Sequence, residues 1–209
     1  MTDRENHSDD LTDFGFEAIP RGEKKHRVRG VFDSVAGRYD LMNDLMSAGV
    51  HRLWKRMAIS KSGLRAGDRA LDIAAGSGDL SAGFAKQVGS AGKVFVTDIN
   101  ARMLAVGRDR LTDEGFVSNV EYVLADAERL PFESRMFDCV CIGFGLRNVT
   151  DKAAALASMY RVLKPGGRAL VLEFSHPHLG PLEPLYDFYS LKVLPRLGEI
   201  VLGDADSYR

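Results

Sequence analysis

The chain has 209 residues, of which 45% are hydrophobic and 27% are charged, a composition that fits one globular domain with a buried core. Its formal net charge is -1 and its isoelectric point is about 6.5, so it has no general positive field to attract nucleic acid, and we expect no nucleic-acid partner. No apolar run approaches the roughly 18 residues that a membrane-spanning helix needs, so a soluble or peripheral protein is expected.

The first 26 residues are polar and show no sustained hydrophobic periodicity, and we expect them to form a flexible N-terminal tail. This tail is too acidic for a mitochondrial transit peptide, and it lacks the apolar core of a secretory signal. These features favour a cytoplasmic protein from a bacterium.

Residues 27–63 carry apolar side chains at helical spacing, with an interruption near Gly49. We expect this segment to form a helical cap at the start of one folded domain that extends over residues 27–209. His51, within the cap, is interpreted as a surface or cap residue rather than as a base.

From residue 70 onwards, short β-rich runs alternate with helical runs. Strands are predicted at residues 70–74, 93–98, 120–125, 137–142 and 168–174, and helices at residues 80–88, 101–111 and 152–163. This alternation predicts an α/β fold with a Rossmann-like, mostly parallel sheet and helices on both faces. Ligands of such sheets bind beyond the carboxyl ends of the strands, where the strand order reverses, so the chemistry is expected at that edge.

Two local patterns refine this prediction. Pro165 and Gly166, before the last strand, suit a type II turn, in which proline fixes one φ and glycine takes a positive φ. The only cysteines, Cys139 and Cys141, share one face of a predicted strand with no further ligands nearby, so core packing is preferred to a metal site.

A glycine loop containing Gly76, Ser77 and Gly78 links the first predicted strand to the first helix of the alternating region. Glycine lets the backbone come close to a ligand and adopt angles that other residues resist. Asp98 closes the next strand, where an acid can accept hydrogen bonds from both ribose hydroxyls. The pattern predicts a nucleoside-binding site.

The identity of the nucleoside follows from the charges around the loop. A dinucleotide-binding fingerprint would need a third glycine where this chain has Ser81. Asp72 before the loop and Asp79 after it would repel a pyrophosphate but suit a cofactor with a sulfonium and an ammonium group. S-adenosylmethionine is therefore preferred, and a nicotinamide cofactor or a turn without a ligand are the alternatives.

The third predicted strand leads into Asp126 and Ala127. An acid at a strand end can accept a hydrogen bond from an adenine amino group, and a small neighbour leaves room for the flat ring. Asp126 could instead be a strand-end cap. Its place as the third acid at successive strand ends, after Asp72 and Asp98, favours the ligand role.

Several segments together resemble a known family. They are residues 31–40, 71–79, 144–151, 159–167, 172–175 and 204–208. The Phe-Gly-Leu-Arg-Asn-Val segment from Phe144 and the Asp-Ala-Asp-Ser-Tyr segment from Asp204 are the most specific. These segments resemble the ubiquinone/menaquinone biosynthesis C-methyltransferases of the UbiE type, which are class I S-adenosylmethionine-dependent methyltransferases. The resemblance extends from about Arg27 to the last residue.

The resemblance implies cofactor contacts at Ser77, Asp98, Asp126 and Ala127. A further family contact is a serine at the position of Gly143, where this chain can offer only backbone atoms. The implied reaction is methylation of a ring carbon of a polyprenylated quinol, either demethylmenaquinol or 2-polyprenyl-6-methoxy-1,4-benzoquinol. Other quinone-biosynthesis proteins are implied as partners, and a homo-oligomer is left open.

Methylation at carbon needs a ring hydroxyl that has lost its proton, because the phenolate pushes electron density onto the neighbouring carbon. We hypothesise that Arg147 stabilises the phenolate and that Asn148 orients it. The alternative for Arg147 is a structural pairing with Asp151 or another acid. Tyr39 is expected either to close the cap over the substrate or only to pack within it.

The C-terminal part of the chain carries two further expectations. Apolar residues at helical spacing between Leu182 and Leu202 predict a helix that covers the sheet, admits a polyprenyl tail and allows peripheral contact with the inner membrane face. No β-hairpin is evident after Phe174, so the last strands of the fold are expected to be missing. A truncated or inactive cofactor-binding paralogue, and a methyltransferase for another small aromatic or lipid acceptor, are the alternative functions.

Overall fold

The computed structural model describes residues 11–14, 17–35 and 50–173 of the chain. The expectations for Tyr39, for the helix between Leu182 and Leu202 and for the missing last strands lie outside the described residues. Along the described part, no helix is both long and apolar enough to cross a membrane.

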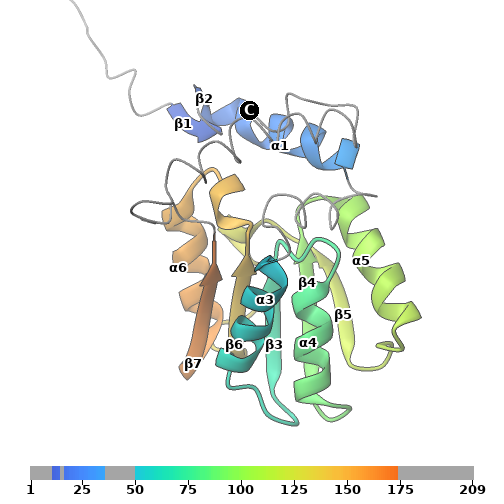
Figure 1. Ribbon diagram of the computed structural model, residues 1–209. Coiled ribbons are helices and arrows are strands. Elements are labelled where there is room, and N and C mark those ends of the chain that lie inside the picture. The colour runs from blue at the N-terminus through green and yellow to red at the C-terminus, as the bar shows by residue number, and fades with distance from the viewer. Residues whose placement is uncertain (1–10, 15–16, 36–49, 174–209) are drawn as a thin grey trace, which may run out of the picture.

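The centre of the fold is a five-stranded sheet with the strand order β5-β4-β3-β6-β7 (Figure 1). Its strands are β3 (Arg69–Ile73), β4 (Lys93–Asp98), β5 (Val120–Leu124), β6 (Phe137–Gly143) and β7 (Leu163–Leu172). All neighbouring strands in this sheet are parallel. The order runs outward from β3 to β5 and then resumes on the other side of β3 with β6, which places the reversal between β3 and β6. The predicted Rossmann-like α/β fold is confirmed.

Helices cover both faces of the sheet, as the alternation of strands and helices predicts. They are α3 (Val50–Lys61), α4 (Asp79–Val88), α5 (Ala101–Asp113) and α6 (Lys152–Val162). Figure 1 shows α3 and α4 in front of the sheet. Successive residues of each strand point to opposite faces, so Ala70 and Cys139 belong to the core layer under α4, whereas Leu71 and Val140 belong to the layer that contains Met159 of α6. Two apolar layers therefore hold the strands in a fixed position.

The strand β7 begins at Leu163, whereas its predicted start is residue 168. The strand pairing begins at Leu163 opposite Phe137 and resumes at Arg168 opposite Cys139, so the residues between them are an insertion in the ladder. Gly166 in this insertion has a φ of 79°, which confirms the positive φ expected from the Pro-Gly pattern. The helix α6 can therefore end and the chain can enter the sheet within a few residues.

The N-terminal segment carries more regular structure than the sequence suggests. Leu11–Phe14 (β1) and Glu17–Pro20 (β2) form an antiparallel hairpin, and the helix α1 (Arg21–Val35) follows at once. The expectation of a flexible tail is therefore wrong for the described residues from residue 11 onwards, which form strands and a helix. Ile19 and Val28 are buried, which gives this short polar segment apolar anchors. Figure 1 shows α1 lying across the end of the sheet to which the strand arrows point.

Candidate cofactor and substrate site

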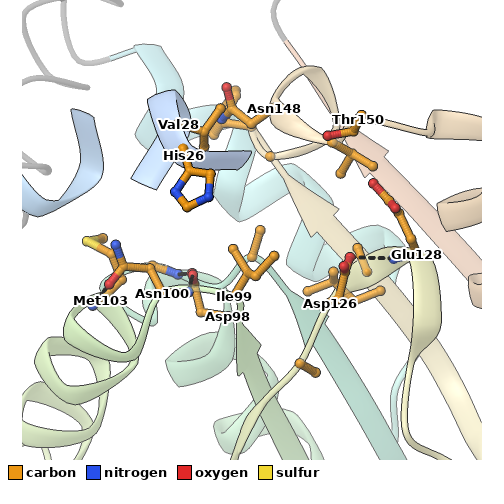
Figure 2. Close-up of a pocket in the computed structure, with 18 residues that line it drawn as sticks. His26, Val28, Asp98, Ile99, Asn100, Met103, Asp126, Glu128, Asn148 and Thr150 are labelled. Carbon is orange, nitrogen blue, oxygen red and sulfur yellow. Dashed lines mark hydrogen bonds between the residues drawn. The ribbon is translucent and has the colours of Figure 1, made fainter. Parts of the chain in front are cut away.

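A cavity of about 380 Å³ lies at the carboxyl edge of the sheet, next to the reversal of strand order. Ala74, Asp98, Asp126 and Asn148 line it from the ends of successive strands and the turns that follow them. His26 and other residues of α1 line it from the opposite side, as Figure 2 shows. The structure therefore brings three of the predicted site regions together beneath the N-terminal helix.

The glycine loop has the backbone that its sequence predicts. Gly76 and Gly78 have φ values of 56° and 81°, in the left-handed region that favours glycine. The loop also packs against α5, because a Cβ added to Gly107 would lie 2.7 Å from the carbonyl oxygen of Gly76. Glycines at these three positions allow the loop to lie between the sheet and α5 with its backbone at the cavity.

Asp98 links the end of β4 to the glycine loop. One carboxylate oxygen accepts a hydrogen bond from Gly76 N at 3.1 Å, and the other accepts one from Asn100 N at 2.8 Å. Burial raises the pKa of Asp98, although these backbone donors act in the opposite direction. The side chain is fixed in orientation and lines the cavity, as an acceptor for ribose hydroxyls would need to be.

Asp126 lies where both of the roles that the sequence left open are compatible with its position. Its Oδ1 accepts a hydrogen bond from Glu128 N at 3.0 Å and so caps the short 3-10 helix η2 (Ala127–Arg129). Asp126 also lines the cavity (Figure 2), and Ala127 is a further lining residue. The capping role is thus present, and it holds the carboxylate at the place where the adenine contact is predicted.

Asp72 is buried at the centre of the sheet, with 1% of its surface exposed. Its Oδ2 accepts a hydrogen bond from Ser81 Oγ at 2.6 Å, whereas Oδ1 has no hydrogen-bond partner in the described part of the chain. Burial raises the pKa of Asp72 to about 7. Ser81 stands where a dinucleotide fingerprint has its third glycine. In this chain its hydroxyl instead holds the carboxylate of Asp72.

Asp79 does not provide the uncompensated negative charge that we expected beside the cofactor. Its carboxylate forms ion pairs with Lys55 of α3 and Arg110 of α5. Burial raises the pKa of Asp79, but the two cations outweigh this effect and bring it below its usual value. The acids that remain at the site are those at the strand ends, Asp72, Asp98 and Asp126.

Arg147 lies in the turn η3 (Leu146–Asn148), which follows β6. Its guanidinium pairs with Glu173 at 2.6 Å, and its backbone N donates to the same carboxylate at 3.1 Å. The buried Lys24 of α1 donates from Nζ to the carbonyl oxygen of Arg147. An acid partner for Arg147 therefore exists, and it is Glu173 rather than Asp151.

The turn η3 brings Asn148 to the cavity but not Arg147, which is not among the lining residues. Asp151, the acid suggested as a partner for Arg147, instead caps α6 by accepting a hydrogen bond from Ala154 N. The catalytic roles proposed for Arg147 and Asn148 stay predictions.

Sequence reasoning missed the residues that reach the site from the N-terminal helices. Figure 2 shows the imidazole of His26 projecting into the cavity above Ile99 and Asn100. Lys24 and His26 lie in the segment interpreted as a tail, and Lys55 lies in a helix recognised only by its apolar spacing. His51 is 2% exposed within α3, so it is not at the surface but does belong to the helical cap, as the other interpretation expected. No local sequence signal marks such residues, because their partners are distant in the chain.

Gly143 ends β6 beside the glycine loop, where the resembled family has a serine. A Cβ added at this position would lie 2.6 Å from Leu80 Cδ1. Leu80 therefore occupies part of the space that a larger residue would need, and this chain keeps only backbone atoms at that point.

Comparison with known proteins agrees with the resemblance seen in the sequence. The model of the ubiE/COQ5 methyltransferase family matches residues 21–209. A relative named ubiquinone/menaquinone biosynthesis C-methyltransferase UbiE, from Teredinibacter turnerae, is 60% identical over 201 residues, which cover 96% of this chain and 81% of the relative. A relative of the same name from Proteus mirabilis is 58% identical over 202 residues, covering 97% of this chain and 80% of the relative.

Solved structures agree on the fold. The YcgJ protein from Bacillus subtilis has a TM-score of 0.56 and 28% identity, covering 68% of this chain and 57% of its own. A SAM-dependent methyltransferase from Aquifex aeolicus has a TM-score of 0.54 and 22% identity, covering 72% of this chain and 78% of its own, and supports the fold alone.

Proposed function

This chain belongs to the ubiE/COQ5 methyltransferase family, and we propose that it transfers a methyl group from S-adenosylmethionine to a ring carbon of a polyprenylated quinol. Demethylmenaquinol and 2-polyprenyl-6-methoxy-1,4-benzoquinol are the proposed acceptors, in menaquinone or ubiquinone biosynthesis. The observation that carries the proposal is one cavity that joins the acids at the strand ends to Asn148. A methyl donor and a ring acceptor can meet only in such a shared space.

The residues around the glycine loop fit S-adenosylmethionine. Asp98 offers a fixed carboxylate for the ribose, and Asp126 with Ala127 offers an acceptor beside space for a flat ring. The buried Asp72 has an oxygen that lacks a partner among the described residues and suits a cationic group. When bound, the cofactor supplies an electrophilic methyl group on its sulfonium.

The turn that contains Arg147 and Asn148 is proposed to act on the quinol ring. Asn148 faces the cavity and can orient a ring hydroxyl through its amide. Glu173 holds both the guanidinium and the backbone N of Arg147, so the turn has a fixed geometry before the substrate enters. We assign Arg147 the stabilisation of phenolate charge; because its guanidinium pairs with Glu173 and does not line the cavity, this role requires the side chain to turn towards the ring when the quinol binds.

The polyprenyl tail of the acceptor also suggests where the enzyme works. Val50, Leu53 and Met57 lie on one side of α3 at helical spacing, and each is more than 40% exposed. We propose that this side of α3 contacts the inner membrane face of a bacterium, where the quinol resides. Association with a second copy or with other quinone-biosynthesis proteins is a further proposal, which co-purification from cells would test.

The central experiment measures methyl transfer by the purified chain. Labelled S-adenosylmethionine is supplied with demethylmenaquinol or with the benzoquinol precursor, and the product is identified by mass and by the position of the label. We expect a methyl group on the ring carbon of at least one quinol. Cofactor binding without transfer would support the inactive paralogue instead, and transfer to oxygen or only to another aromatic acceptor would support the third alternative.

A further inference from the structure

Lys24 of the helix α1 is buried, with 1% of its surface exposed. Removing an ammonium group from water is costly, so a buried lysine is stable only where acceptors replace that water. Its Nζ donates to the carbonyl oxygen of Arg147 at 3.1 Å, 123 positions later in the chain. An apolar side chain could fill the same space without this cost. The contact that joins α1 to the turn η3 therefore does more than fill space.

The atom that Lys24 holds belongs to the peptide bond between Arg147 and Asn148. The N–H of the same peptide bond donates to the carbonyl oxygen of Gly145 at 3.0 Å. Both polar atoms of this peptide are thus held, which fixes the orientation of its plane. Asn148 follows directly, so this plane determines the direction of its side chain. Figure 2 shows Asn148 reaching the upper part of the cavity, where α1 also contributes Val28.

Glu173 supports the same turn by a different contact. Its carboxylate accepts from the backbone N and from the guanidinium of Arg147. The guanidinium contact is lost if Arg147 turns towards the quinol ring, as proposed above. The hydrogen bond from Lys24 does not depend on that side chain, because it is made to the backbone. Lys24 can therefore hold the turn while Arg147 moves.

The N-terminal segment has further contacts with the residues after the turn, and these are weaker. Arg21 and Asp151 lie 4.0 Å apart with both side chains nearly half exposed, a kind of ion pair that contributes little. Ile19 and Val28 are buried apolar anchors of the segment. Loss of the Lys24 hydrogen bond should therefore leave α1 in place and affect mainly the turn.

We propose that Lys24 is a positioning residue for methyl transfer, which fixes the peptide bond before Asn148 and so the direction in which Asn148 meets the ring hydroxyl of the quinol. Lys24 does not line the cavity, so it acts through the turn rather than on the reacting atoms. The helix α1 then takes part in aligning the acceptor, in addition to covering the cavity. The inference rests on the proposed function.

The first test compares turnover with cofactor affinity. Lys24→Met is expected to lower kcat for the quinol about 10- to 100-fold at saturating cofactor, because a small misplacement of an aligning group is costly. The affinity for S-adenosylhomocysteine, and for 5′-methylthioadenosine, which lacks the amino-acid end, should stay unchanged in calorimetric titration. Lys24→Arg keeps a cationic donor and should recover part of kcat. Arg21→Met removes an exposed cation from the same helix and should keep kcat.

The second test needs no substrate. Amide hydrogen exchange of the ligand-free chain, followed by NMR, reports how firmly the N–H of Asn148 is held. Lys24→Met should speed exchange at Asn148 about 10-fold, the effect of losing one hydrogen bond to a charged group, and should leave the strands of the sheet unchanged. Lys24→Gln is a second variant, with the same expected losses because its amide is shorter and uncharged. Unchanged exchange at Asn148, a uniform rise over the whole chain, or an equal fall in kcat and in ligand affinity would overturn the assignment.

The two tests distinguish this inference from the proposed function. If the original chain methylates no quinol, the proposed function fails, while exchange at Asn148 still decides whether Lys24 fixes the turn. If the original chain methylates a quinol and Lys24→Met does so at the same rate, the proposed function stands and the positioning role of Lys24 fails.

Discussion

Asp72 illustrates how one buried acid can link cofactor binding to pH. Burial raises its pKa from 3.8 to about 7, although Ser81 and Lys55 lower it and Asp98 is a nearby like charge. Each pKa unit corresponds to about 1.4 kcal/mol, so the full shift corresponds to about 4 kcal/mol. An acid whose pKa is raised on folding contributes stability below its unfolded pKa and loses that contribution as the pH rises through its folded pKa.

We therefore expect the free energy of unfolding of the ligand-free chain to fall between about pH 4 and pH 7 by up to about 4 kcal/mol through Asp72. Asp72→Asn should remove this part of the pH dependence, as measured by urea unfolding at several pH values. The exposed Asp113→Asn serves as the control and should keep it. An unchanged pH profile in Asp72→Asn would contradict the buried-acid account, whatever the effect on cofactor affinity.

Arg147 can be tested by separating turnover from binding. Arg147→Ala is expected to lower kcat for the quinol by about 100-fold or more, the usual effect of removing one group that stabilises developing charge. The affinity for S-adenosylhomocysteine should stay the same, because the proposed nucleoside contacts, Asp98 and Asp126, lie at the ends of β4 and β5, whereas Arg147 follows β6. Turnover is measured under saturating cofactor, and circular dichroism checks folding. Normal turnover in a folded variant would leave Arg147 only its pairing with Glu173.

At the scale of single elements, the helix α5 contains Gly107, although helix propensity disfavours glycine at such a position. Alanine is favoured over glycine inside a helix by about 1 kcal/mol. A Cβ on Gly107, however, would lie 2.7 Å from the Gly76 carbonyl oxygen. The contact is with backbone rather than with a flexible side chain, so either α5 or the glycine loop would have to move.

Gly107→Ala is expected to destabilise the fold by about 1–3 kcal/mol, the usual cost of overpacking, and to weaken S-adenosylhomocysteine binding. Gly30→Ala is the matched helical control, because nothing lies within 4 Å of its added Cβ. That variant should be neutral or more stable by up to about 1 kcal/mol. Chemical unfolding of both variants measures the difference, and equal stability would show that the loop does not depend on its contact with α5.

The same scale shows what local sequence can and cannot predict. The β4 strand is predicted with its observed bounds, Lys93–Asp98, since the four residues between these two charged ends are β-branched or aromatic and favour a strand. The hairpin at residues 11–20 is not predicted, because each strand has four residues and its apolar anchor, Ile19, is one residue in a polar segment. Periodicity needs more residues than such a hairpin provides.

Ion pairs between distant elements were also beyond local prediction. Asp79 was expected to add negative charge to the site, yet Lys55 and Arg110 compensate it from 24 and 31 positions away in the chain. The site acids at strand ends could be predicted because parallel strands place their carboxyl ends at one edge. The cations could not, since they come from helices whose packing against α4 is a property of the folded chain.

At the scale of the whole molecule, one part of the described surface suits a lipid-tailed substrate. The exposed apolar side of α3 carries Leu53 and Met57, with the exposed Arg56 beside them. Apolar side chains can enter the boundary of a bilayer while basic ones meet anionic headgroups. On α6, Tyr160 provides a large side chain on another helix that is even more exposed, at 82%.

We expect the double substitution of Leu53→Asn and Met57→Asn to reduce binding of the chain to anionic vesicles several-fold, because it removes two apolar contacts with the bilayer. Tyr160→Ser is the control and should bind vesicles as the original chain does. Flotation on a density gradient measures the bound fraction, and titration with methylthioadenosine checks that the nucleoside site is intact. If both variants floated equally well, α3 would not be the membrane-facing element, and the quinol tail would have to approach the cavity over another part of the surface.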